Sequence, residues 1–159
     1  PTFSINRSAL WALEILREEG FRYDSSVFPT RNMLYGYPDA PRFPYCPLDG
    51  NGFVEFPLST VRVLGVNLPV AGGFYLRALP YRLFRWGLRR IEREGMPAIL
   101  YLHPWELDPD HPRPEPTPRE RFTHYHNLKG TADRLQALLQ DFEFGPLSSL
   151  LHDVQGMEA

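Results

Sequence analysis

The stretch Ala98-Ile99-Leu100-Tyr101-Leu102-His103-Pro104-Trp105-Glu106 decides the fold class of this chain. Residues 98–102 form a continuous apolar run, which is typical of a strand covered on both faces in a parallel sheet. The run ends in polar residues, and the active groups of parallel α/β folds collect at the carboxyl ends of strands. His103 therefore occupies a position where a side chain that changes charge near neutral pH can pass protons.

Helical and extended patterns alternate on both sides of this run, which indicates an α/β sheet or barrel. Apolar residues recur at helical spacing in three segments, which predicts helices over residues 7–19, 80–94 and 131–141. Shorter apolar patterns predict strands at 21–23, 53–56, 61–64 and 142–144, and helical turns at 146–154. Residues rich in glycine, proline and charge predict loops at 67–73 and 107–120.

A proline-rich excursion over residues 27–52 is the main irregularity, and its proline density excludes a long helix there. We expect one domain over residues 1–154 with a tail at 155–159. A net charge of −2 leaves no broad cationic surface for nucleic acid, so no nucleic-acid partner is expected. No apolar run approaches the roughly 18 residues of a membrane span. The single cysteine, Cys46, excludes an internal disulfide and a multi-cysteine zinc site.

A second polar cluster, Asp24-Ser25-Ser26, follows the strand expected at 21–23. An aspartate at this tip can fix the tautomer of His103 on a neighbouring tip, and the pair would make an acid catalyst. Structural roles stay open: His103 can make an ordinary hydrogen bond, Asp24 can cap a turn, and Trp105 can belong to the core. His124 and His126 would share one face of a strand and could bind a metal, but a solvated face explains them too.

Beyond these patterns, the chain resembles a known family in five motifs that occur in order. The motifs are Gly20-Phe21-Arg22-Tyr23-Asp24-Ser25-Ser26, Pro38-Asp39-Ala40-Pro41-Arg42-Phe43-Pro44, Glu55-Phe56-Pro57-Leu58-Ser59-Thr60, Leu68-Pro69-Val70-Ala71-Gly72-Gly73 and Tyr101-Leu102-His103-Pro104-Trp105-Glu106. Together they resemble the polysaccharide deacetylases of carbohydrate esterase family 4, with their NodB-type domain. More narrowly, they resemble the bacterial subgroup associated with exosortase and exopolysaccharide loci, which carries a C-terminal extension.

The resemblance implies that the chain is the C-terminal part of a distorted (β/α)7 barrel with a Pro-rich extension. It implies a hydrolase of non-peptide C–N bonds that removes N-acetyl groups from amino sugars in a bacterial polysaccharide. His103 matches the general acid and Leu102 the residue lining the acetyl pocket, although Leu102 directly precedes His103 here. Asp24 matches the aspartate that orients this histidine. Substrate-binding positions are expected at Leu102, Trp105, Ser25, Gly72 and Gly73.

The family uses a divalent metal, usually zinc, but its early Asp-Asp and His-x-x-x-His motifs are absent from this sequence. We therefore expect the metal ligands in a longer parent protein, and we expect this chain alone to be inactive. Such a truncated barrel would leave a sheet edge unpaired, through which the chain could self-associate. The alternatives are a non-catalytic carbohydrate-binding or scaffold module, with Trp105, Tyr75 and Tyr101 stacking on sugars, and a related amidase acting on small C–N substrates. No targeting segment is visible, so the bacterial cytoplasm and the cell envelope both stay open.

Overall fold

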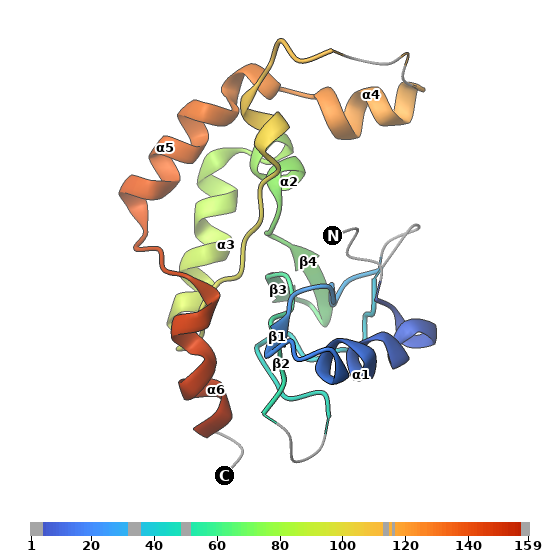
Figure 1. Ribbon diagram of the computed structural model, residues 1–159. Coiled ribbons are helices and arrows are strands. Elements are labelled where there is room, and N and C mark those ends of the chain that lie inside the picture. Colours follow the sequence, from blue (N-terminus) through green and yellow to red (C-terminus); the bar gives the residue numbers. More distant parts are fainter. Residues whose placement is uncertain (1–4, 32–35, 49–51, 113–114, 116, 157–159) are drawn as a thin grey trace.

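The computed structural model describes residues 5–31, 36–48, 52–112, 115 and 117–156 (Figure 1). Within these ranges the chain is a mixed α/β domain of helices and short strands, and its paired strands form two separate two-stranded sheets. The α/β class expected from the sequence is confirmed. The described residues do not form a closed barrel.

The three helices expected from apolar periodicity are present. They are α1 (Trp11–Glu18), which follows a 3-10 turn at Arg7–Ala9, α3 (Tyr81–Arg93) and α5 (Thr131–Asp141). Glycines with positive φ follow the first two, because Gly20 (φ 86°) and Gly95 (φ 75°) reverse the chain at little steric cost. The Asn6 side chain accepts a hydrogen bond from the Ser8 backbone N–H and so caps the first turn.

The strands are shorter than expected. β1 (Tyr23–Asp24) pairs in parallel with β2 (Val54–Glu55), in the register Tyr23↔Val54 and Asp24↔Glu55. β3 (Thr60–Val63) pairs with β4 (Val66–Pro69) as an antiparallel hairpin. A loop was expected from residue 67, but β4 includes residues 67–69, so this expectation was wrong there. The hairpin is closed by Leu64 and Gly65, which both have positive φ and form a two-residue turn. No described strand covers 142–144.

The apolar run 98–102 is extended but joins neither sheet, so its assignment as a central strand was wrong for the described residues. Ile99 is fixed by hydrogen bonds of its backbone to Ser59. Its carbonyl accepts from the Ser59 N–H at 3.2 Å, and its N–H donates to Ser59 Oγ at 2.7 Å. The segment therefore lies beside β3, whose neighbour Ser59 fixes it at Ile99.

Two helices were not expected. α2 (Gly73–Ala78) follows β4 closely, and α4 (Pro118–Tyr125) begins inside the proline-rich loop. α4 starts there because Thr117 and Glu120 form a reciprocal capping box and Pro118 fits the first helical turn. The other short helical turns are Pro104–Leu107, Leu128–Gly130 and Leu147–Leu150, and α6 (Leu151–Gly156) ends the described chain. The last two elements confirm the helical turns expected after residue 146.

The buried apolar residues form three clusters. One lies under α1, one between α3, α5 and the hairpin, and one between β2, the excursion and α6. In Figure 1, α3 and α5 form a helical layer beside the strands, and α4 projects from the top. Arg134 of α5 fixes the carboxyl end of α2, since its Nη1 donates to the carbonyl of Leu76 and, at 3.0 and 2.7 Å, to those of Arg77 and Leu79.

Candidate functional site

His103 is the residue immediately before the 3-10 turn Pro104–Leu107, and its side chain is half-buried. Pro104 occupies the first position of this turn, where its fixed φ suits a helical start. The Glu106 backbone N–H donates to the His103 carbonyl at 3.0 Å and closes the turn. The backbone that carries the imidazole is therefore held in a single local conformation.

The side chains of Tyr101 and Glu106, from this same segment, pack against Gly72 and Gly73. A Cβ at Gly72 would lie 2.6 Å from the ring of Tyr101, and one at Gly73 would lie 1.4 Å from Oε2 of Glu106. Gly72 also has φ of 89°, which few residues other than glycine adopt. Both glycines were expected to bind substrate. In the structure, the space left by their missing side chains is filled by Tyr101 and Glu106.

Glu106 and Arg77 form a buried ion pair below the turn. Their side chains are 3% and 1% exposed, and Arg77 Nε lies 3.4 Å from Glu106 Oε2 without hydrogen-bond geometry. Burial lowers the pKa of Arg77, and the Glu106 carboxylate opposes this shift. The other guanidinium nitrogens donate to the backbone carbonyls of residues 123, 124 and 126. One arginine thus joins the turn, α2 and the end of α4.

Aromatic rings surround the turn. The His103 ring is stacked on Trp105 with centroids 5.8 Å apart, and it forms a T-shaped contact with Tyr101 with centroids 5.4 Å apart. Trp105 also stacks with His124 at 5.8 Å, and the Arg77 guanidinium lies 6.0 Å from its ring centre. Trp105 is therefore packed among rings of its own chain. In the described part of the chain no hydrogen bond reaches either ring nitrogen of His103.

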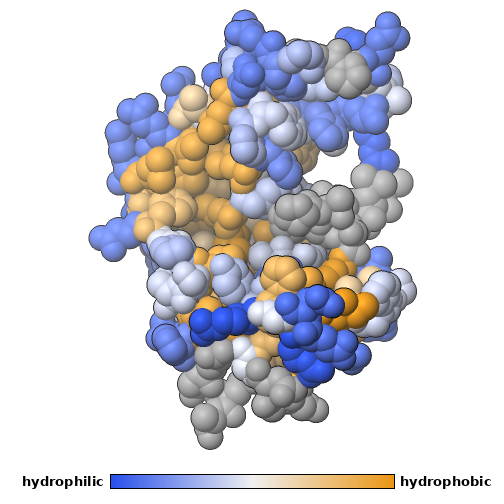
Figure 2. Space-filling view, viewed as in Figure 1, coloured by the Kyte–Doolittle hydropathy of each residue, from blue (hydrophilic) through white to orange (hydrophobic). Residues whose placement is uncertain are grey.

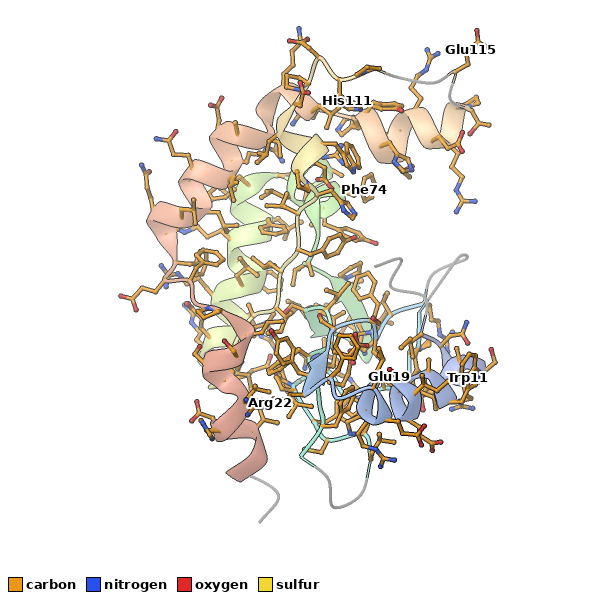
Figure 3. All side chains as sticks on the ribbon, in the orientation of Figure 1. Trp11, Glu19, Arg22, Phe74, His111 and Glu115 are labelled. Carbon is orange, nitrogen blue, oxygen red and sulfur yellow. The ribbon has the colours of Figure 1, made fainter. Side chains whose placement is uncertain are left out.

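Asp24 does not meet His103. Its Oδ1 accepts from Ser26 Oγ at 3.0 Å, and its carboxyl interacts with Glu55 of the paired strand. Figure 3 shows Phe74 and His111 in the upper part of the molecule, by the ring cluster, and Arg22, next to β1, in the lower part. The expectation that Asp24 orients the His103 ring is therefore not met, because the sheet carries the aspartate to a different region.

Glu55 is a buried acid that sequence reasoning did not single out. It is 0% exposed, and its Oε1 accepts the backbone N–H groups of Ser26 at 3.1 Å and Val27 at 2.9 Å. Burial, and then the nearby Asp24, raise the pKa of Glu55 to about 8. A proton on the Glu55 carboxyl would relieve its repulsion with the Asp24 carboxyl, which stands opposite it in the strand register.

The remaining expected site residues have structural contacts. Ser25 Oγ donates to the Phe56 carbonyl at 2.7 Å, so this hydroxyl ties the end of β1 to the segment after β2. Leu102 is half-buried and packs against the core cluster between α3 and α5. Neither contact leads to the His103 ring.

No cluster of three or more histidine, cysteine or acidic side chains fit to hold a metal is found among the described residues. His124 lies in α4, and His126 directly follows the last residue of this helix. The expectation that the two histidines share one face of a strand is therefore wrong. Residues two apart on a helix point in different directions. Among the described helices, none is long and apolar enough to cross a membrane.

Sequence reasoning missed Glu55, Arg77 and Glu106, because each is buried only through partners far away in the sequence. The sequence shows the Gly72-Gly73 pair, but only the structure shows that Tyr101 and Glu106 pack against it. A glycine that lies against a side chain from a distant part of the chain indicates close packing.

No curated protein and no solved structure matches this chain at a significant level. A family model does match over residues 25–152, which is more than half of the chain and includes Glu55 and the His103 turn. The chain therefore belongs to the family described as a domain of unknown function, DUF3473.

Proposed function

We propose that this chain is the C-terminal part of a metal-dependent polysaccharide N-deacetylase, in which His103 is the general acid. The proposed domain is a distorted (β/α)7 barrel completed by other segments of the polypeptide. The five ordered motifs that resemble carbohydrate esterase family 4 support this proposal. The substrate class would be a bacterial polymer that contains N-acetylated amino sugars.

The observation that carries the proposal is the presentation of His103. A general acid must hold a proton within reach of the leaving group and must not spend it on a structural hydrogen bond. The His103 ring is held by contacts with Tyr101 and Trp105, and its nitrogens have no hydrogen-bond partner among the described residues. Below it, the buried pair of Arg77 and Glu106 fixes the turn.

The metal does not fit the residues described here, since they contain no suitable group of three ligands. We therefore derive no step through a metal, and we assign its binding to other segments of the proposed parent. The contribution of this chain is proton delivery. His103 would protonate the amine nitrogen of the sugar as the amide C–N bond breaks, and Leu102 would line the acetyl pocket. Asp24 stays outside this path because it contacts Glu55 and Ser26.

The test is the His103→Ala substitution in the longer polypeptide, with an N-acetylglucosamine oligomer as substrate and free amine release as the readout. We expect turnover to fall by about 10² to 10⁴-fold, as is typical when a general acid is lost. The matched control is His152→Ala, because His152 is an exposed histidine on α6. Unchanged activity in the His103→Ala protein would remove the assignment.

A carbohydrate-binding module is the second candidate, but the packing of its expected rings weighs against it. Tyr75 makes edge contacts with Phe28 and Phe74. Tyr101 fills the space above Gly72, and Trp105 stacks with two histidines. Rings that are engaged in this way offer little free face for stacking on a sugar.

A further inference from the structure

A groove of about 240 Å³ lies along the extended run that carries Ala98 and Leu100. Its walls come from two extended segments, residues 96–100 and residues 142–147, and α3 contributes Leu88 to the lining. Figure 2 shows apolar surface gathered over α5 and the chain in front of α3. The groove is thus an apolar channel with backbone on two sides.

The backbone of this run presents unpaired groups to the groove. In an extended chain the N–H and C=O of successive residues point to opposite edges. Ile99 directs both of its groups to Ser59, so Ala98 and Leu100 direct theirs to the other edge, where the groove lies. Across the described residues, the backbone N–H and C=O groups of Ala98 and Leu100 have no hydrogen-bond partner. An extended apolar edge of this kind is a template for one more strand.

The charge of the residues that line the groove indicates which kind of polypeptide it can bind. Among the described residues the lining includes the acids Glu92 and Glu143 and no basic residue. Glu92 pairs with Arg89, whereas Glu143 has no ion-pair partner in the described part of the chain. A second copy would bring the same acidic, concave surface and would not complement it. A basic, extended segment of a different polypeptide would.

We propose that this groove is a β-strand addition site. It binds an extended peptide that pairs with the backbone of Ala98 and Leu100, places alternate aliphatic side chains on the apolar floor, and carries Lys or Arg near Glu143. Backbone pairing would supply affinity, while the floor and Glu143 would supply selectivity. This inference does not depend on the deacetylase assignment.

The test uses a designed peptide as the probe, acetyl-Lys-Val-Thr-Val-Thr-Val-Lys-amide, with a fluorescent label and anisotropy as the readout. Two variants carry N-methyl groups, one on the valines and the other on the threonines, so that each blocks a different edge of the strand. We expect one of them to bind about tenfold more weakly than the parent peptide and the other to bind almost as well, since two lost hydrogen bonds of ordinary strength have about that effect. The protein is unchanged in this comparison, so misfolding cannot explain a loss.

Variants of the protein complete the test. Glu143→Lys should weaken binding of the peptide by about fivefold, in line with the loss of an exposed ion pair. This variant should bind a peptide with glutamate ends more tightly than the peptide with lysine ends. The matched control is Glu115→Lys, which changes the same charge beside α4, far from the groove in Figure 3. An absence of binding, equal effects of the two methylated peptides, or equal effects of the two substitutions would overturn the proposal. A dimer in sedimentation that the peptide cannot dissociate would also overturn it, because the groove would then hold a second copy.

Discussion

Asp24 and Glu55 stand directly opposite each other on the parallel strands β1 and β2, and each keeps one carboxyl oxygen that accepts no hydrogen bond from another group. Two acids in this position cannot both be ionised at low cost, because burial and like charge both disfavour the second carboxylate. A proton on one of the two carboxyls relieves this repulsion. We therefore expect protonation of this pair to contribute to the stability of the β1–β2 contact.

This pair predicts that stability depends on pH. The folded pKa of Glu55, about 8, lies above its ordinary value of 4.5, so the folded protein keeps a proton that the unfolded chain releases between these values. The stability that this proton contributes is complete below about pH 4.5 and is lost as the pH rises through 8. The slope of unfolding free energy in this window is at most about 1.4 kcal/mol per pH unit.

Urea unfolding of the wild-type chain and of Glu55→Gln at several pH values between 5 and 8 checks this. The neutral amide should flatten the slope because it does not titrate. Glu18→Gln is the control, since Glu18 is exposed at the end of α1. Parallel slopes for wild type and Glu55→Gln would show that the proton is not on this pair.

Gly73→Ala is expected to destabilise the protein even though alanine is the better helix former. In an open helix this change would stabilise by about 0.5–1 kcal/mol. Here the new methyl group would displace the Glu106 carboxyl from Arg77, and we expect a loss of about 3 kcal/mol in thermal or urea unfolding.

Gly145→Ala provides the comparison for Gly73. Its Cβ would meet Ser149 Oγ at 3.6 Å, which is an ordinary contact, so a change within about 0.5 kcal/mol is expected. If the two alanine variants had equal stability, the close packing of Glu106 on Gly73 would be wrong.

Leu64→Asn is expected to stabilise the protein by about 0.5–1 kcal/mol. Leu64 has a φ of 49° in the β3–β4 turn and is 99% exposed, so it carries backbone strain and has no packing to lose. Asparagine adopts this conformation readily and is favoured before glycine in two-residue hairpin turns. Leu64→Ala is the control, because it removes the same side chain without relieving the strain. A melting temperature for Asn no higher than that for Ala would contradict this account.

Local patterns predicted the long helices well. α3 and α5 follow from apolar residues at helical spacing, and Gly95 marks the end of α3. The run 98–102 shows the limit of such patterns. Its composition predicts a buried strand, but pairing needs neighbouring strands, and the run joins neither sheet of the described residues although Ile99 bonds to Ser59. Composition sets the conformation of a strand, whereas its partners decide whether it joins a sheet.

The candidate site was predicted in part. The sequence places His103 in a polar segment after an apolar run, but it does not show the packing of Tyr101 and Glu106 on Gly72 and Gly73 or the contact of Asp24 with Glu55. A buried charge depends on partners that are distant in the sequence. Glu106 is buried because Arg77 lies beneath it, 29 positions earlier in the chain. Nothing in the local sequence around either residue shows that they meet.

The hydrogen bonds from Arg134 to the end of α2 limit where this protein can be truncated. The helix under the catalytic candidate is tied down by a residue near the C-terminal third of the chain, and Arg77 is tied in turn to carbonyls after residue 122. A fragment that stops before α5 would keep every motif up to the Trp-Glu dipeptide and still lose the scaffold beneath it. Expression boundaries should therefore be drawn after α6, because Leu151 and Val154 also belong to the buried core.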